Sequence, residues 1–324
     1  FNEMANIRRE GEPDVVEVSK IVPTLLPKNI DLLTNSRENS IILMGQQHIN
    51  NDNTPNSDTV FGYRYLNVGD QRRQAAWFKW QFNNPLLYHF VINDEYFFLD
   101  TDHFLHTVKL VQESTDPSIS QDNVEFLLHL DNYTTVSGGV YSPSLNITTF
   151  SGMGWLTGVT THAYTELAVV DGTGRYGKPT VSGAQFTLPG NWQGLTLTAG
   201  YIYDYEVKLP RLYPLKVKDK GAAADVHASL IIHRIKLHFG KIGLYETTLE
   251  RVGKVKYTEV YESTQLQEYD AGDAPYLEEF IKTVPVYERN TNVDIIIKSK
   301  HPAPTTLRAL SWEGDYSPRF YQRV

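Results

Sequence analysis

Two carboxylates and two histidines lie close together in the sequence between residues 100 and 106. Asp100 and Asp102 are separated by one residue, and His103 and His106 follow them. Carboxylates two positions apart on a strand share one face, and histidine could complete a metal site or an acid–base pair. The same residues stand between the apolar runs FFL and FLH, which is also the pattern of a polar hairpin turn. Both interpretations stay open at this point.

A second pair of carboxylates, Asp204 and Glu206, lies in the stretch YIYDYEV. Glycosidases use two carboxyl groups that face each other across about 5 to 10 Å, from different strands. Tyr201, Tyr203 and Tyr205 surround this pair, and aromatic faces bind sugars, although tyrosine-rich strands are also typical of interfaces and cores. Glycan binding or glycan hydrolysis, by a secreted or virion-associated β protein, is therefore the alternative function.

Other catalytic patterns are missing from the sequence. The turn VVDGTGRYGKP lacks the GxxxxGK[ST] pattern of a phosphate loop, and no GxSxG nucleophile turn occurs. The chain has no cysteine, which excludes thiol catalysis and cysteine-ligated zinc. The odd spacing of His233 and His238 predicts that they lie on opposite faces of one strand. We expect no enzyme, no cofactor and no metal centre.

The composition favours β structure and disfavours a nucleic-acid-binding protein. Among 324 residues there are 20 Tyr, 14 Phe and 5 Trp but only 3 Met, a bias toward residues that occupy strands. The formal net charge of −8 repels nucleic acid at long range. The first residues, FNEMANIRREGEPD, show neither an initiator methionine nor a signal pattern, so we expect a piece of a longer protein.

Short apolar runs alternate with polar stretches between Ser40 and Gln112. This spacing predicts an antiparallel meander, which is the unit of a propeller blade. Ile41 to Gln112 could supply roughly one and a half to two blades, too few to close a ring, so the remaining blades would lie in a missing N-terminal part or in another chain. The expected strands are SIILMGQ, TVFGYRYL, LLYHFVIN, EYFFLD and HTVKLVQ, with NNDNTPNSD and NVGDQRRQ among the polar stretches that separate them.

The polar stretch ESTDPSISQDN predicts a domain boundary, with one domain at 1–112 and the other at 113–324. The second contains expected turns at Asp171–Gly174 and Pro189–Asn191 and a long, strictly alternating strand in SLIIHRIKLHFGKIGLYETTLER. Helical spacing occurs in Asp273–Val284. The predicted fold is mainly β: incomplete β-propeller strands, then an antiparallel sandwich-like platform, with one short helix.

Several stretches together resemble tail tubular protein B, the nozzle protein family of short-tailed bacteriophages. They are YRYLNVGDQRRQAAWFKWQF, which contains Gln74-Ala75-Ala76-Trp77, then YEVKLPRLYPLKVKD, HRIKLHFGKIGLYE, VPVYERNTNVDIIIKSK and the closing SWEGDYSPRFYQRV. The resemblance runs from about Ile30 to the end and corresponds to the C-terminal part of that family.

The resemblance implies a structural virion protein, made in the cytoplasm of the host bacterium. Six copies would form a ring below the tail adaptor, contact the tail fibres and enclose the channel through which viral DNA leaves without sequence-specific binding. Trp, Tyr and Arg concentrate interface energy, so the interface candidates are Trp77, Trp80, Trp312, Tyr316 and Arg319, with core packing as the alternative for Trp77 and Trp312.

The last fourteen residues, SWEGDYSPRFYQRV, are predicted to be a docking tail. Glu313-Gly314-Asp315 is expected to turn the chain after a strand, and Pro318 to prevent further pairing. Removal of this tail after Leu310 would then weaken assembly more than folding.

Overall fold

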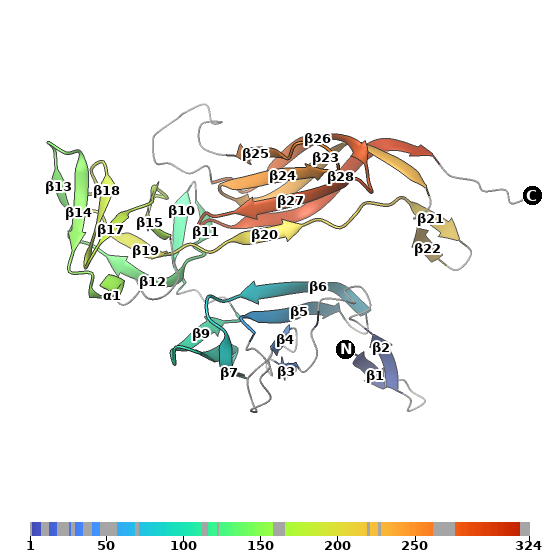
Figure 1. Cartoon of the computed structure of the whole chain (residues 1–324), viewed down its shortest axis with the longest axis horizontal. Helices are drawn as coiled ribbons and strands as arrows, with labels where there is room; N and C mark the ends of the chain where they lie inside the picture. The colour runs from blue at the N-terminus through green and yellow to red at the C-terminus, as the bar shows by residue number, and fades with distance from the viewer. Residues whose placement is uncertain are drawn as a thin grey trace, which may run out of the picture. The chain divides into compact units, whose positions relative to one another are not determined.

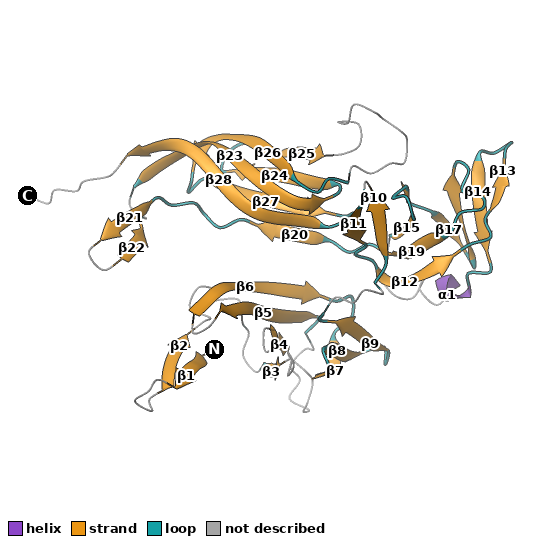
Figure 2. Ribbon diagram, turned by 180° about the vertical axis from the view of Figure 1, so that it is seen from behind, coloured by secondary structure: helices purple, strands orange, loops and turns teal. Residues whose placement is uncertain are grey.

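The computed structural model describes residues 2–7, 13–17, 26, 30–34, 41–45, 57–68, 71–111, 116–121, 123–157, 166–218, 221–225, 228–261 and 276–317. These residues form antiparallel sheets (Figure 1), and the one helix among them is α1 (Gly154–Thr157), coloured purple in Figure 2. The mainly β fold predicted from the sequence is confirmed. The chain divides into two compact units, Phe1–Ser114 and Thr115–Val324.

The first unit is built from strands that pair with their neighbours in the sequence. Its larger sheet has the order β3-β4-β5-β6 and the next has the order β7-β8-β9, while β1 and β2 form a separate hairpin. This is the predicted antiparallel meander. The strands are β1 (Asn2–Ile7), β2 (Pro13–Glu17), β3 (Asp31–Thr34), β4 (Ile41–Gly45), β5 (Thr59–Val68), β6 (Gln71–Gln81), β7 (Leu86–Ile92), β8 (Glu95–Asp100) and β9 (Leu105–Lys109).

Two hairpin connections of the first unit, β7–β8 and β5–β6, can be compared with the local sequence. Asn93 and Asp94 both have positive φ angles, 51° and 65°, which is the conformation that closes a two-residue hairpin between β7 and β8. The stretch NVGDQRRQ separates β5 from β6, as predicted, but both strands extend further into it than expected. Asn67 pairs with Arg72 and Val68 with Gln71, so most of the stretch extends the long β5–β6 hairpin.

The core of the first unit joins both meanders. Leu43, Val60, Leu86 and Tyr96 are buried in one cluster, and the ring of Phe82 packs at a tilt against that of Phe98, with centroids 4.2 Å apart. Burial of each such side chain contributes about 1.5–3 kcal/mol to folding. The alternating apolar pattern of β8 supplies Tyr96 and Phe98 to this core because strand residues two apart share a face.

The second unit begins with a sandwich of two four-stranded sheets. One sheet has the order β12-β19-β15-β16 and the other β13-β14-β18-β17, and Phe150, Val169, Phe186 and Leu197 pack between them. The strands are β12 (Asp131–Val136), β13 (Val140–Ser142), β14 (Ile147–Ser151), β15 (Leu167–Asp171), β16 (Tyr176–Gly177), β17 (Thr180–Ser182), β18 (Gln185–Pro189) and β19 (Leu197–Tyr201).

The hairpin of β10 (Ser118–Gln121) and β11 (Val124–Leu127) covers the other face of β15. Ile119 and Phe126 from this hairpin pack against Ala168 and Val170, so every residue of β15 is buried. Tyr276 and Ala303, from segments flanking the strands of the second sandwich, join the same cluster. This cluster therefore links the two sandwiches of the second unit.

The second sandwich is formed by the sheets β20-β27-β24-β25 and β26-β23-β28, and β21 and β22 form a separate hairpin. Leu230, Leu237, Val284 and Ile297 lie among its core residues. The strands are β20 (Tyr205–Lys208), β21 (Leu215–Lys218), β22 (Gly221–Ala224), β23 (Ser229–Ile242), β24 (Tyr245–Arg251), β25 (Tyr257–Tyr261), β26 (Phe280–Arg289), β27 (Val293–Ser299) and β28 (Thr305–Ser317).

The long strand β23 differs from its predicted pattern at one position. The register shifts between Ile232 and Arg234 on both sides of the strand. Relative to β28, His233 is the extra residue of a bulge in β23. Relative to β26, the extra residue lies in β26, between Pro285 and Glu288. Ile232 and Ile235 can both point into the core on either side of this bulge. The prediction that His233 and His238 lie on opposite faces is therefore wrong, because the bulge places both on the outer face.

The helix predicted at Asp273–Val284 is also wrong, and the short helix of the fold is α1 instead. Residues 273–275 lie outside the described part of the chain, Leu277 forms an isolated bridge with Ile242, and β26 begins at Phe280. Val284 pairs with Ile235 in the centre of the sheet. Tertiary pairing with β23 overrides the local helical spacing of these apolar residues.

A buried histidine, His301, lies in the link between the two sandwiches. Its ring packs against Tyr176 at a centroid distance of 4.6 Å, and its Nδ1 accepts a hydrogen bond of 3.1 Å from the backbone N–H of Ala303. Nε2 has no hydrogen-bond partner among the described residues. Burial lowers the pKa of His301 to about 3, so the folded protein holds this ring neutral.

His301 should make folding sensitive to acid. The pKa of His301 in the unfolded chain is near 6.5. Below that pH the unfolded chain binds a proton at His301, whereas the folded chain does not. The free energy of unfolding therefore falls as the pH falls toward 3. The loss is about 1.4 kcal/mol per pH unit. His301→Asn keeps an acceptor near the Nδ1 position and should flatten this slope in urea unfolding between pH 6.5 and pH 4. Parallel pH curves for both proteins would contradict the assignment, and unfolding at pH 8 supplies the baseline.

Candidate functional site

The Asp100 cluster closes the turn between β8 and β9. Asp100 is 2% exposed, and its Oδ2 lies 2.9 Å from Nε2 of His106 and 3.1 Å from Nδ2 of Asn84. Its Oδ1 accepts the backbone N–H of Phe104 at 2.8 Å. Burial raises the pKa of Asp100, but the hydrogen bonds from His106, Phe104 and Asn84 outweigh it and hold the pKa below its ordinary value.

These contacts favour the turn over the catalytic interpretation. Asn84 also donates to Asp102 at 2.9 Å, and His103 occupies the turn with a φ of 66°. Every polar atom of the Asp100 carboxylate is thus engaged in holding the hairpin. Within the described ranges, no group of three or more His, Cys, Asp or Glu side chains is arranged to hold a metal ion.

The structure pairs Asp204 and Glu206 with lysines. Asp204 Oδ1 lies 3.0 Å from Nζ of Lys300, and Glu206 Oε2 lies 2.7 Å from Nζ of Lys298, so each acid faces a lysine that lies on or directly after β27. A glycosidase needs one protonated and one ionised carboxyl group across the sugar. Here each of the two acids contacts a lysine, and the described contacts show no pair of carboxyl groups arranged for this chemistry.

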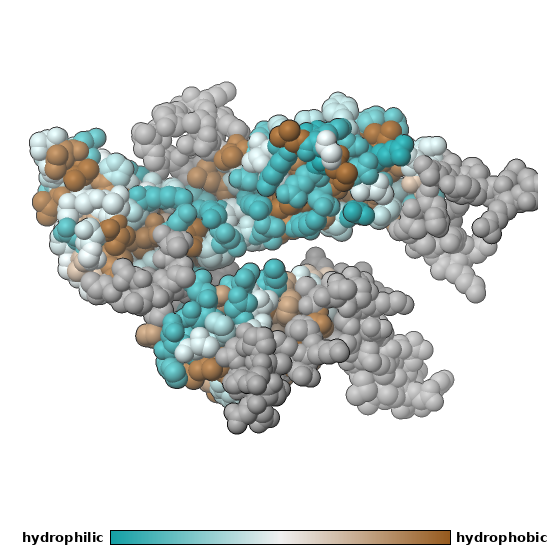
Figure 3. Space-filling model, viewed as in Figure 1, coloured by the Kyte–Doolittle hydropathy of each residue, from teal (hydrophilic) through white to brown (hydrophobic). Residues whose placement is uncertain are grey.

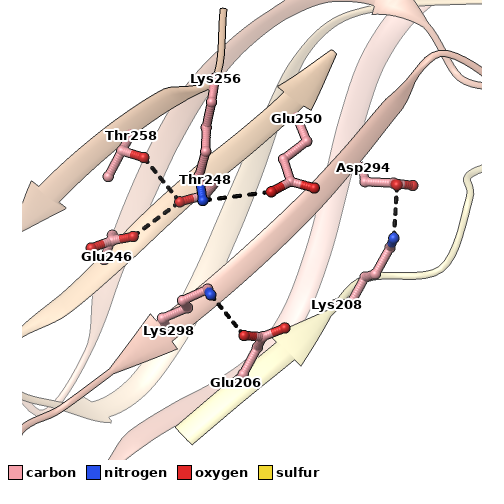
Figure 4. A network of polar contacts seen from close by, with 9 residues as sticks. All are labelled: Glu206, Lys208, Glu246, Thr248, Glu250, Lys256, Thr258, Asp294 and Lys298. Carbon is pink, nitrogen blue, oxygen red and sulfur yellow. Dashed lines mark hydrogen bonds and ion pairs between the residues drawn. The ribbon is translucent and has the colours of Figure 1, made fainter. Parts of the chain in front are cut away.

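Glu206 and Lys298 belong to a larger set of ion pairs on the outer face of the sheet β20-β27-β24-β25 (Figure 4). Lys208 contacts Asp294 at 2.7 Å and Lys256 contacts Glu250 at 3.5 Å, while Thr248 bridges Glu246 and Thr258. We call this surface the paired-charge face; it consists of Glu206, Lys208, Glu246, Thr248, Glu250, Lys256, Thr258, Asp294 and Lys298. All three of its lysines are matched by carboxylates of neighbouring strands.

The glycine-rich turn at Asp171–Gly174 is a loop, as predicted, and its function is structural. Asp171 Oδ1 accepts the backbone N–H groups of Thr173 and Arg175, each at 2.9 Å. Arg175 in turn lies 3.8 Å from the ring centroid of Trp192 and donates to the carbonyl oxygen of Asn191 at 2.7 Å. The two predicted turns are therefore locked together by one arginine.

Three of the interface candidates pack against cores. The ring of Trp77 lies tilted against that of Tyr63, with centroids 4.8 Å apart. Trp80 packs against the core of the first unit, and Trp312 packs against the core of the second sandwich. Tyr316 is exposed, and its hydroxyl donates to Asp225 at 3.0 Å. Arg319 lies outside the described residues, as do Pro318 and the rest of the C-terminus.

The turn predicted at Glu313-Gly314-Asp315 is wrong, because these residues lie within β28. Gly314 pairs with Ile232, and a Cβ at Gly314 would lie only 2.1 Å from the carbonyl oxygen of Ile231. The glycine is thus required by the close approach of two strands next to the bulge and not by a turn. Residues 311–317 belong to the sandwich, so only the residues after Ser317 can form a separate tail.

The opposite outer face of the same sandwich, on the sheet β26-β23-β28, carries the residues that the sequence analysis missed. Ile281 is 60% exposed and Tyr287 is 69% exposed, and Pro285 lies exposed between them on β26. Alternation in VPVYER, with Val284 and Val286 buried, is the signal that could have placed Pro285 and Tyr287 outside. In the view of Figure 3, hydrophobic residues lie in small groups among hydrophilic ones on the second unit.

Two truncations should separate folding from any docking role of the C-terminus. A chain that ends at Leu310 loses residues 311–317 of β28 and the Trp312 side chain, so we expect its free energy of unfolding to fall by about 3 kcal/mol or more. A chain that ends at Ser317 keeps the whole strand and should unfold like the full chain, within about 0.5 kcal/mol. Equal urea midpoints for the two truncations would show that this part of β28 does not stabilise the sandwich.

The comparisons with known proteins identify a family for the chain. The description of the matching family is bacteriophage nozzle protein, and the match covers residues 1–323. No curated protein matches the chain. The described residues include no helix that is long and apolar enough to cross a membrane. The chain belongs to the bacteriophage nozzle protein family and is a structural component of the virion tail.

Proposed function

We propose that the chain is the nozzle subunit of a short phage tail and has no enzymatic activity. Six copies form a ring around the DNA-ejection channel, and the ring joins the tail adaptor to the tail fibres. The observation that carries this proposal is the family match over residues 1–323. The chain is made in the host cytoplasm and functions in the virion.

We assign different roles to the two units, and their strand order supports this assignment. Residues 1–112 provide part of a propeller, since β3-β4-β5-β6 and β7-β8-β9 are meanders of the kind that form blades. Residues 113–324 provide the platform, whose two sandwiches present broad strand faces to other subunits. Such a unit suits a ring because a sandwich has two outer faces that point in opposite directions.

The charges of the second sandwich suit a surface near moving DNA. Phosphate contacts by lysine and arginine release counterions and add affinity, which would slow the exit of DNA. On the paired-charge face, Lys208, Lys256 and Lys298 are each held by a carboxylate. A phosphate would have to displace that carboxylate, so such a surface binds DNA weakly. The formal charge of −8 acts in the same direction.

The interface candidates fall into two groups in this proposal: those free to contact a neighbour and those that pack against a core. Tyr316 is exposed at the end of β28 and can contact a neighbour, and Arg319 lies in the C-terminal tail that would reach the neighbour or the adaptor. Trp77, Trp80 and Trp312 contribute first to the cores against which they pack. They can reach an interface only through the parts of their rings that stay exposed.

Native mass spectrometry of the purified full chain tests the ring directly. We expect a particle of six chains, each of 36.9 kDa, with a central opening in electron micrographs. The same preparation should release no reducing ends from host polysaccharide, and Asp204→Asn and Asp102→Asn should leave both results unchanged. A single chain that cleaves glycan, and loses this activity with either substitution, would replace the nozzle by the hydrolase.

A further inference from the structure

The outer face of the sheet β26-β23-β28, which we call the Tyr287 face, combines exposed apolar side chains with charged ones. Ile281, Pro285 and Tyr287 follow one another along β26, while Arg234 and Lys236 on β23 both contact Glu313 on β28. Tyrosine and arginine at the centre of a patch are the residues that most often dominate binding energy. Nothing in the packing of the sandwich core requires these outward side chains.

Tyr287 is held in an unusual backbone conformation. Its φ is 46°, in the left-handed region, where a bulky residue is an outlier that costs about 1–3 kcal/mol. The ring stacks on His233 with centroids 5.8 Å apart and planes 26° apart, and Nε2 of His233 lies 3.1 Å from Oδ2 of Asp315. A chain of contacts across all three strands thus fixes an exposed aromatic ring. This fixed ring needs little further ordering when it binds a partner.

Two irregularities at the same level of the sheet produce this arrangement: the bulge at His233 in β23 and the extra residue of β26 between Pro285 and Glu288. The bulge lets His233 and the next residue, Arg234, both project from the outer face, so one reaches Tyr287 and the other reaches Glu313. Bulges commonly re-aim side chains next to functional sites. The same strand therefore builds the core with one row of side chains and prepares a binding surface with the other.

The two outer faces of the second sandwich differ in what they show to their surroundings. The paired-charge face is lined by lysines and carboxylates that satisfy one another. The Tyr287 face exposes the larger side chains of Ile281 and Tyr287, whereas the apolar side chain exposed opposite Glu246 on the paired-charge face is Val260. A surface with exposed aromatic and aliphatic groups rimmed by charges is typical of a protein contact.

Charge identifies the partner of the Tyr287 face. Its cations are Arg234, Lys236, Arg289 and Arg308, and its anions are Glu279, Glu313 and Asp315, so it carries one net positive charge. The whole chain has a formal charge of −8, and its remaining surface is correspondingly acidic. A second copy of the chain therefore offers an acidic surface to this slightly basic, partly apolar face. DNA is a poorer partner because the three carboxylates would repel its phosphates.

We propose that the Tyr287 face docks a second copy of this chain, against a different and more acidic surface of that copy. Such a contact is head-to-tail, and repeated contacts of this kind close into a ring when the rotation permits. The inference rests on the proposed ring and assigns one of its two contact surfaces. Ile281, Pro285 and Tyr287 form the apolar centre of the contact, and Arg234 and Arg289 form part of its charged rim.

The test compares variants of the full chain in which only an outer face changes. Tyr287→Gly removes the ring, and glycine adopts a φ of 46° without strain, so this variant should fold at least as well as the original. The double variant Ile281→Asp with Tyr287→Asp adds two negative charges to the face. Val255→Asp with Val260→Asp is the matched control, because both valines are exposed in the same sandwich, away from the Tyr287 face. Thermal unfolding checks that each variant folds.

Sedimentation velocity over a range of concentrations gives the dissociation constant of the assembly. We expect it to rise at least about tenfold for Tyr287→Gly and further for the aspartate pair, with the control within about twofold of the original chain. If the original chain forms rings and every variant forms them equally well, another protein or solvent covers the Tyr287 face, and this inference fails while the nozzle assignment stands. If the original chain stays a single chain at every concentration, the proposed ring fails as well.

Discussion

The second sandwich depends on the pairing of β23 with a strand on each of its sides. Five side chains of β23, at positions 230, 232, 235, 237 and 239, are almost completely buried, and the strand hydrogen-bonds to β26 along one edge and to β28 along the other. The core of the sheet would be incomplete without either neighbour. The bulge at His233 keeps the inner row continuous while it shifts the outer row by one residue. Core packing and the composition of the outer face are therefore set by the same strand.

Local sequence patterns predict the strands but not the contacts that decide their details. The alternation in β8 and the apolar runs of β4 and β23 are visible because burial acts on every second residue or on a whole strand. The bulge is not visible, since it depends on the register of both partner strands. The helix predicted at Asp273–Val284 is wrong for a related reason. Ile281 and Val284 have helical spacing, yet each pairs with β23, and they lie on opposite faces of a strand.

Candidate sites were predicted less well than the fold, because a side chain's partners come from distant segments. Asp204 and Glu206 are close in sequence, but their partners are not: Glu206 pairs with Lys298 on β27 and Asp204 with Lys300 directly after it. Gly314 suggested a turn because glycine is common in turns. In the structure, a glycine is required at this position because the carbonyl oxygen of Ile231 on the neighbouring strand leaves no room for a Cβ. Large aromatic residues suit cores and interfaces equally, and only burial separates Trp312 from Tyr287.

The two outer faces of the second sandwich suit the two opposed requirements of a tail nozzle. A channel wall must stay hydrated and give a passing polyanion few cations to hold, which ion pairs between strands achieve because each lysine already has a carboxylate. A contact between subunits must instead lose water and gain more than the ordering of its side chains costs. Tyr287 meets that second requirement, since its backbone and its stack on His233 fix the ring before any partner arrives. In the proposed ring, the two sheets of one sandwich can therefore serve different roles without a change of fold.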